Sequence, residues 1–393
     1  MIYLQKNSET WPNFDRNQAN IVKKILLSNK VNYWTGNQGK DFELEFKKYI
    51  GVKYAVAIAN ASLGLEYALK ALGISYGDEV IVTPKSFITS VSSIISLKAT
   101  PVFADIDLNS HNISVDQILK KISNKTKAIM CVHLAGFPCD MRKIIKIAKN
   151  YNLKIIEDCS QALGGKIDNQ HLGSFGNISV WSFCNDKIIS TGGEGGMICT
   201  NNKRIWKKIW SLKDTGKNYD KVYKKKHNFG FKWLNDNFGT NLRMTEIQAA
   251  LGRYQLNKLD GYLKRRKNNS IKIINECKKY RSLTIQEIPQ NYEHAFYRCY
   301  ILVNDKYLIN KFNRDKIIQS LNKSGVLCNV GSCSEIYLEK AFHGKKYKPK
   351  KRLKNAMYTS KNTIAFLVHP TLSSQYINYS VGVIRKLMNK ITI

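Results

Sequence analysis

Short apolar runs alternate with amphipathic stretches over the first half of the chain. Residues 62–72 have apolar side chains at helical spacing and end at Gly73, which predicts a helix. Strands that alternate with helices indicate an α/β fold with a mainly parallel sheet between two layers of helices. Further helices are predicted from Phe87 onward and over 114–122 and 140–150. The predicted strands are 54–60, 79–84, 100–106, 127–134, 153–159, 178–184 and 195–200.

The pattern changes toward the C-terminus. The stretch 203–237 is polar and rich in lysine, which predicts a long loop. A helix is predicted after it, over 244–258, with Thr245 as its capping residue. After about residue 266 helices are longer and strands fewer. We therefore expect a large domain over residues 1–265 and a smaller α+β domain over residues 266–393. Its predicted strands are 299–303 and 365–369, and its predicted helices are 314–323 and 375–389.

The chain is strongly basic. Its 393 residues carry 63 Lys+Arg against 29 Asp+Glu, a net charge of +34, and 43% of them are hydrophobic, enough for a large core and too many for a disordered chain. The lysines are spread along the whole sequence, and no zinc-finger, basic-zipper or RNA-recognition pattern occurs, so we expect no nucleic-acid partner. A positive field that attracts anionic metabolites is the milder interpretation. A basic, non-catalytic binding or regulatory protein remains an alternative.

The nine cysteines are odd in number and form no C-x-x-C pair. Disulfide frameworks and structural zinc sites need paired spacing, so we expect reduced thiols, no metal and a cytoplasmic protein. No apolar run approaches the roughly 20 residues of a membrane span, and the first 16 residues lack the apolar middle of a signal peptide. We therefore expect neither export nor a membrane partner.

Candidate chemistry lies where the predicted strands end. Ser62 opens a helix whose free N–H groups favour a phosphate, and Phe87 offers an aromatic face. Asp158 can hold a protonated ring nitrogen, and Lys187, just before the glycine-rich turn 191–196, can form a Schiff base with an aldehyde. Phosphate, aromatic ring, ring nitrogen and aldehyde are together the chemical groups of pyridoxal 5′-phosphate.

With these residues in order, the sequence resembles the DegT/DnrJ/StrS family of pyridoxal-phosphate-dependent sugar aminotransferases. The resemblance implies the aspartate-aminotransferase fold (fold type I): a large domain with a mixed, mainly parallel sheet flanked by helices, and a smaller C-terminal α+β domain. It extends over almost the whole chain. The stretches that carry it are IANASLGLEYALKAL, GDEVIVTPKSFITSV, VHLAGFPCDM, IIEDCSQALGG, GSFGNISVWSFCNDKIISTGGEGGM and GTNLRMTEIQAALGRYQL.

The resemblance implies roles for individual residues. Lys187 matches the Schiff-base lysine and Asp158 the partner of the ring nitrogen, and both are the expected catalytic residues. Asn241 matches an asparagine that reaches the cofactor of the neighbouring subunit, which implies a homodimer with shared active sites. The implied cofactor contacts are Ala61, Ser62, Phe87, Asp158, Gln161, Ser182, Lys187 and Asn241. The candidate substrate contacts are Thr35, Lys217, Arg243 and His294.

The implied reaction moves an amino group from L-glutamate to a keto sugar. The expected acceptor is a nucleotide-diphosphate-linked 4-keto-6-deoxyhexose or a 3-keto sugar, in the biosynthesis of amino sugars for surface polysaccharides such as lipopolysaccharide O-antigen. Family members that deoxygenate sugars carry His at the position of Lys187, so the lysine favours transamination. A pyridoxal-phosphate-dependent sugar dehydratase or lyase on the same scaffold remains the alternative.

Overall fold

The computed structural model describes residues 10–393. The expectation that the chain is not exported rests on the first 16 residues, so it lies partly outside the described residues. A seven-stranded sheet has the order β1-β9-β8-β5-β4-β2-β3, in which β9 is antiparallel to both its neighbours and the other pairs are parallel. This arrangement confirms the predicted mixed sheet. Its strands are β1 (Tyr54–Ile58), β2 (Glu79–Val82), β3 (Thr100–Phe103), β4 (Thr126–Val132), β5 (Lys154–Asp158), β8 (Ile178–Ser182) and β9 (Gly196–Thr200).

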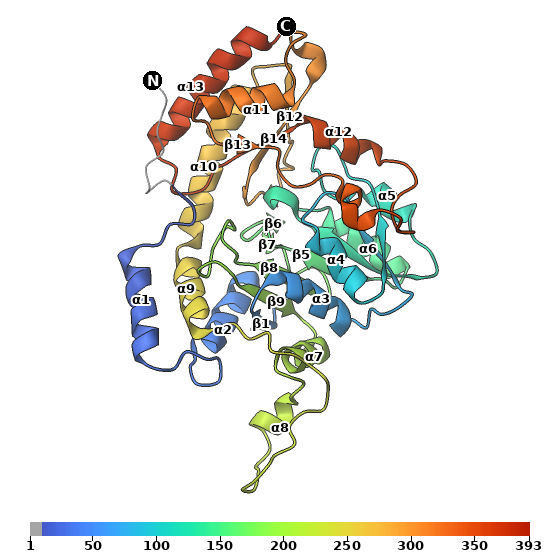
Figure 1. Ribbon diagram of the computed structural model, residues 1–393, viewed down its shortest axis with the longest axis vertical. Helices are drawn as coiled ribbons and strands as arrows, with labels where there is room; N and C mark the ends of the chain where they lie inside the picture. Colours follow the sequence, from blue (N-terminus) through green and yellow to red (C-terminus); the bar gives the residue numbers. More distant parts are fainter. Residues whose placement is uncertain (1–9) are drawn as a thin grey trace.

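Helices cover both faces of this sheet (Figure 1). Alternate residues of a strand point to opposite faces, so Ile129 and Cys131 pack into one core while Ala128 and Met130 pack into the other. This two-sided burial explains the continuous apolar runs of the sequence. The first core lies under α2 (Gln38–Ile50), α6 (Met141–Asn150) and α9 (Glu246–Asn257); the second lies under α3 (Ala61–Ala71), α4 (Thr89–Ser96) and α7 (Lys203–Lys213). α5 (Val115–Leu119) is a short helix, and α1 (Arg16–Leu27) packs against α9.

The prediction of a loop over 203–237 is wrong for its first third, because α7 occupies residues 203–213. Ile209 and Trp210 are buried on one face of α7, whereas the lysines lie mostly on the other, and Asn202 caps the helix by accepting N–H groups. A short helix, α8 (Tyr219–Tyr223), follows. Residues 219–240, called the arm below, project from the body of the molecule (Figure 1).

A second, four-stranded sheet carries the C-terminal part, in the order β10-β12-β14-β13. The expected domain boundary at 265/266 falls within the continuous helix α10 (Leu259–Cys277), and the division into two domains stays a prediction. The strands are β10 (Leu283–Ile285), β12 (Cys299–Val303), β13 (Cys328–Asn329) and β14 (Thr363–Phe366), beside α11 (Arg314–Lys323), α12 (Lys354–Asn362) and α13 (Ser374–Ile391). A small third sheet pairs β11 (Tyr292–Glu293) with β6 (Lys166–Ile167) and β7 (Gln170–His171). Within residues 10–393, no helix is both long and apolar enough to cross a membrane.

Candidate active site

A cavity of about 510 Å³ opens where the strands of the large sheet end, beside the start of the C-terminal part. It brings together seven of the residues that the sequence singles out, although they are far apart along the chain. They are Ala61, Ser62, Phe87, Asp158, Gln161, Ser182 and Lys187. The loops after β1, β2, β5 and β8 supply most of them, as expected for ligands at the carboxyl ends of parallel strands.

Lys187 is almost buried in this cavity, and its surroundings favour the charged ammonium group. Its Nζ atom lies 3.5 Å from Oδ1 of Asp186 and 5.1 Å from the centre of the Tyr297 ring. Burial alone would lower the pKa of Lys187, but Tyr297 and Asp186 outweigh it and raise the pKa above its usual value. The backbone is held as well, because Trp11 Nε1 donates to the Lys187 carbonyl oxygen at 2.7 Å.

Asp158 is a nearly buried carboxylate whose described side-chain hydrogen-bond partners are all neutral. It is 5% exposed, and its oxygens accept hydrogen bonds from Ser90 Oγ at 2.9 Å and the Ser160 amide at 3.2 Å. Buried carboxylates are normally paired with a positive charge. Asp158 can therefore accept a further cationic N–H group from a molecule bound in the cavity.

The start of α3 forms a site suited to an anion. The Asn60 side chain accepts the Leu63 N–H, while the amides of Ala61 and Ser62 belong to the first turn, whose N–H groups lack helical partners. A side chain at Gly196 would bring a Cβ atom to 3.0 Å from the Ala61 nitrogen. The glycine thus lets β9 pack closely against the backbone at the start of α3.

Two further side chains suit a flat ring. Phe87 is 65% exposed although it lines a cavity, so its aromatic face is available for stacking. Gln161 is fixed by two hydrogen bonds: its Oε1 accepts the Ala135 N–H at 2.8 Å, and its Nε2 donates to Ser332 Oγ at 3.4 Å.

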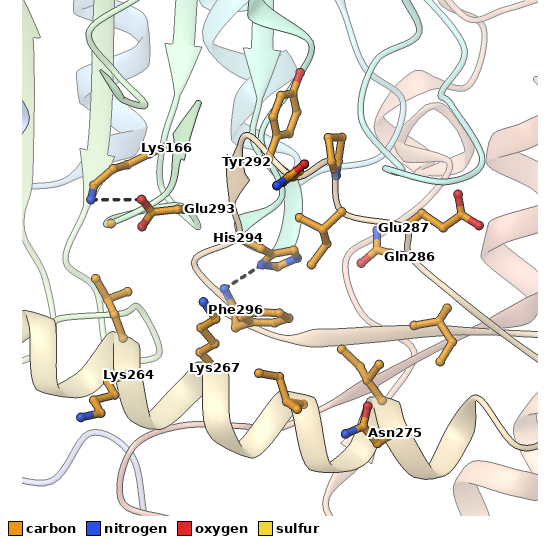
Figure 2. Close-up of a pocket in the computed structure, with 18 of the residues that line it drawn as sticks. Lys166, Lys264, Lys267, Asn275, Gln286, Glu287, Tyr292, Glu293, His294 and Phe296 are labelled. Atoms are coloured by element: carbon orange, nitrogen blue, oxygen red, sulfur yellow. Dashed lines mark hydrogen bonds and ion pairs between the residues drawn. The ribbon is translucent and has the colours of Figure 1, made fainter. Parts of the chain in front are cut away.

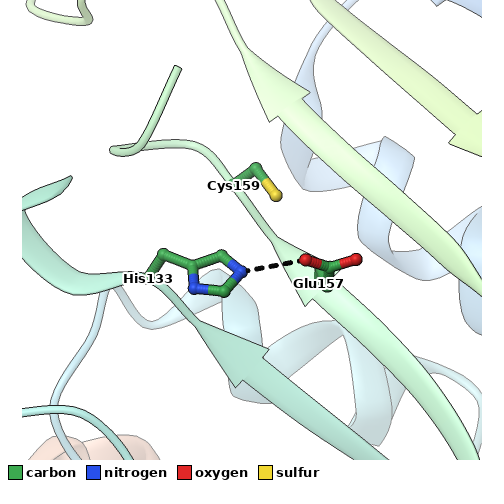
Figure 3. A group of neighbouring side chains, drawn as sticks. All are labelled: His133, Glu157 and Cys159. Carbon is green, nitrogen blue, oxygen red and sulfur yellow. Dashed lines mark hydrogen bonds and ion pairs between the residues drawn. The ribbon is translucent and has the colours of Figure 1, made fainter. Parts of the chain in front are cut away.

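Behind the cavity, His133, Glu157 and Cys159 lie close together (Figure 3), with ligand atoms within 4.8 Å of one another. Glu157 accepts hydrogen bonds from His133 Nε2 at 3.1 Å and from three backbone amides: Gly173 at 2.8 Å, Phe175 at 2.9 Å and Gly176 at 2.6 Å. His133 Nδ1 accepts the Cys139 N–H, which assigns the proton to Nε2. These bonds make Glu157 and His133 a structural brace that fixes β5 against the neighbouring backbone.

Four other candidate residues lie outside the cavity, around Asp214 or near it. Its Oδ1 atom accepts from Arg243 Nη1 at 2.8 Å and from Lys217 Nζ at 3.0 Å. Asn241 pairs with Asp214 through a backbone bridge, and Thr35 is an exposed turn residue that bonds Asn32. This chain therefore does not bring its own Asn241, Lys217, Arg243 or Thr35 to its own Lys187.

His294 lies elsewhere, in a groove of about 1050 Å³ between α10 and residues 283–294 (Figure 2). Its Nδ1 atom accepts the Phe296 N–H at 2.8 Å, and burial lowers its pKa to about 3, so the ring is neutral. His294 does not line the cavity of Lys187, and its role as a substrate contact stays a prediction. This groove has the larger volume, but Lys187 and Asp158 lie in the smaller cavity. The smaller cavity is therefore the candidate active site.

The sequence reasoning missed several residues of the cavity. Asp186 accepts the Tyr297 hydroxyl and also pairs with Arg298, and Ser332 holds Gln161. Asp186 directly precedes Lys187, and Arg298 directly precedes the buried strand β12, so their positions next to singled-out elements were the available signal.

Comparisons with known proteins agree with this geometry. Residues 12–385 match the model of the DegT/DnrJ/EryC1/StrS aminotransferase family. The chain belongs to this family. It is 44% identical over 256 residues (65% of this chain, 67% of the relative) to the GDP-perosamine synthase of Escherichia coli O157:H7. It is 33% identical over 319 residues (79% of this chain, 84% of the relative) to a dTDP-3-amino-3,6-dideoxy-alpha-D-galactopyranose transaminase of Aneurinibacillus thermoaerophilus. A solved aminotransferase from Psychrobacter cryohalolentis matches with a TM-score of 0.95 and 44% identity, over 97% of this chain and 98% of that one.

Membership of this family makes the protein a pyridoxal-phosphate-dependent sugar aminotransferase. The cavity fits the cofactor on four counts: an amine at Lys187, an unneutralised carboxylate at Asp158, an exposed ring at Phe87 and the open helix start at Ser62. The catalytic interpretation is thus favoured over that of a basic binding protein.

Proposed function

We propose that the protein transfers the amino group of L-glutamate to a nucleotide-diphosphate-linked 4-keto-6-deoxyhexose or 3-keto sugar, with Lys187 and Asp158 as its catalytic residues. The observation that supports this most is that both side chains line one cavity with the start of α3. When bound there, pyridoxal 5′-phosphate supplies an aldehyde that takes up the amino group and a ring that accepts electrons from the reacting carbon. Ala61, Ser62 and Ser182 would hold its phosphate, Phe87 would stack on its ring, and Gln161 would lie beside its phenolic oxygen.

The chain's own groups divide the work. Asp158 keeps a ring nitrogen protonated, because a nearby carboxylate favours the positive charge. The Lys187 amine, once it has lost its proton, would take the proton from the donor's α-carbon and deliver it to the carbon of the cofactor's aldehyde group. Asp186 holds the Lys187 ammonium group in place between these steps.

The relatives differ in the sugar that they are named for. One is named for GDP-perosamine and another for a dTDP-linked 3-amino sugar. These names support the class of acceptor, but they identify neither the nucleotide that it carries nor the carbon that receives the amino group. The net charge of +34 favours an anionic acceptor of this kind. The nine free thiols, all within the described residues, support our prediction of a reducing, cytoplasmic location, which stays a prediction.

Incubation with L-glutamate and a panel of nucleotide-linked 4-keto and 3-keto sugars, followed by product mass measurement, tests the proposal. Transfer of nitrogen to one sugar of the panel is the expected result. Loss of a hydroxyl group without gain of nitrogen would instead support the dehydratase alternative. A protein that stays colourless with the cofactor and changes no sugar would refute both.

We also propose that the protein is a homodimer in which Asn241, Lys217 and Arg243 of one subunit serve the cavity of the other. The proposal is supported by the position of these three residues outside their own cavity and by the state of Lys217 and Arg243, whose cationic groups Asp214 holds together. The neighbouring arm exposes large apolar rings at Phe229, Phe231, Trp233 and Phe238, which a second subunit can cover.

Mixing two impaired variants tests the shared site. If each site combines Lys187 of one subunit with Asn241 of the other, a heterodimer of Lys187→Ala with Asn241→Ala contains one intact site. A statistical mixture then recovers about one quarter of the wild-type activity, which neither variant has alone. No recovery after subunit exchange, shown by mass-tagged chains, would place the site within one subunit.

A further inference from the structure

Arg298 and Lys187 are the only two cationic side chains among the described residues that line the cavity. The same wall carries three acidic side chains, Asp158, Asp186 and Glu194. An amino acid that donates its amine must bring at least one carboxylate into this acidic space, and L-glutamate brings two. Lys187 cannot hold that carboxylate permanently, because its amine takes part in the reaction. Among this chain's own residues at the cavity, the unassigned cation is therefore Arg298.

We propose that Arg298 binds a carboxylate of the amino donor, and this inference rests on the proposed function. Arginine suits the task because its planar guanidinium group can bind both oxygens of a carboxylate at once. Lys217 and Arg243, which the proposed dimer brings from the other subunit, are candidate contacts of the sugar acceptor, so we assign donor recognition to the subunit that carries Lys187.

The guanidinium group is held in place before a donor arrives. Its Nη2 atom lies 3.3 Å from Asp186 Oδ2, its Nη1 atom is 3.4 Å from the Tyr297 carbonyl oxygen, and its carbon lies 4.4 Å from the centre of the Tyr297 ring. The side chain is 14% exposed, so its charge is only weakly screened by water. The contact with Asp186 is longer than the usual 2.7–2.9 Å of charged pairs, and the other is to a neutral carbonyl, so the group can still donate to a better partner.

Asp186 holds the Arg298 cation near the reacting amine of Lys187. Its two oxygens face different partners: Oδ1 faces Lys187 Nζ at 3.5 Å and Oδ2 faces Arg298 at 3.3 Å. The Asp186 carboxylate thus lies between the two cations and contacts both. A donor whose carboxylate lies on Arg298 has its own amine directed toward the position of Lys187, as an exchange of amines requires.

The two half-reactions of a transaminase can be measured separately, and this makes the proposal testable. In the holoenzyme, L-glutamate converts the bound cofactor to its amine form, which changes the visible absorbance; a keto sugar then reverses the change. For Arg298→Gln, we expect the apparent affinity for L-glutamate to fall between about ten- and one-hundred-fold, the effect of losing a hydrogen bond to a charged group. The rate with the keto sugar, started from the amine form, should stay within twofold of wild type.

A binding measurement without turnover supplies the second readout. Glutarate has two carboxylates and no amine, so it can occupy the donor site without reacting, and its Kd by calorimetry should rise in Arg298→Gln by the same factor. Arg298→Lys should recover part of the affinity, and Arg281→Gln, which removes an exposed arginine of the C-terminal part, should behave as wild type.

The outcomes separate this inference from the proposed function. Equal losses in both half-reactions, or an unchanged Kd for glutarate in Arg298→Gln, would overturn the role of Arg298 even if a keto sugar is aminated. A selective loss with L-glutamate and glutarate would support it even if the sugar panel yields no product.

Discussion

Replacement of Glu157 by glutamine is expected to destabilise the protein strongly, although Glu157 does not line the cavity of Lys187. Glu157 is fully buried, and its two oxygens accept four hydrogen bonds, two each. Glutamine has one oxygen, so its NH₂ group must face two of the four donors. His133 cannot resolve the conflict by moving its proton to Nδ1, because Nδ1 accepts the Cys139 N–H.

Two buried donors without acceptors cost about 1–3 kcal/mol each, so the free energy of unfolding should fall by about 2–6 kcal/mol. That is a large share of the roughly 5–15 kcal/mol by which a folded protein is stable. Urea unfolding of the cofactor-free chain, followed by circular dichroism, measures the change as a shift of the midpoint. Glu287→Gln is the matched control, because the side chain of Glu287 is exposed.

A shift below about 0.5 kcal/mol, the usual effect of a surface change, would refute the account of Glu157 as a brace. The assay also separates a brace from a metal centre. A brace predicts the same midpoint with and without a strong chelator in the wild-type protein. A chelator that lowers the midpoint would show that His133, Glu157 and Cys159 hold an ion.

Three shorter predictions follow from other buried or exposed groups. Lys187→Ala should abolish turnover. Borohydride should then attach no cofactor covalently to the protein, while the circular dichroism spectrum should match that of the wild type. Phe87→Ala should weaken cofactor binding by a few-fold to about tenfold, measured by absorbance titration, because a stacking face is lost. Lys85 is fully buried against His111 and Thr363, and burial holds its pKa well below 10.5. Because the pKa of Lys85 is lower in the folded than in the unfolded chain, wild type should gain stability relative to Lys85→Met as the pH rises toward the usual lysine pKa of about 10.4, by up to about 1.4 kcal/mol per pH unit in urea titrations; a pH-independent difference would contradict this.

Sequence patterns predicted the large sheet well, because a strand buried on both faces is a continuous apolar run, as in Ile129, Met130 and Cys131. They failed for α7, where the lysines of an amphipathic helix mask the apolar face that contains Ile209 and Trp210. The pattern at 365–369 also misplaced β14, which begins at Thr363, since a strand start depends on its partner strand.

The candidate site was predictable only where its residues follow strands of the large sheet. Asp158 and Lys187 were found because parallel strands bring their carboxyl ends to one edge. Arg298 and Ser332 reach the cavity through the packing of the C-terminal part, which no local pattern encodes. Asn241 matched the family pattern, yet its place outside this chain's cavity could not be read from a single sequence.

Glu157 and Asp158 show how tertiary structure assigns different roles to like residues. They are adjacent carboxylates on β5, and successive side chains of a strand point to opposite faces. One face gives Glu157 three backbone amides and a histidine, which fix it completely. The other gives Asp158 a hydroxyl and one amide at the wall of the cavity, so that its charge remains available to a ligand. A register shift of β5 by one residue would exchange the two environments. The brace around Glu157 therefore also fixes Asp158, the carboxylate that we propose as catalytic, and Glu157→Gln should weaken cofactor binding through Asp158 even under conditions in which the variant remains folded.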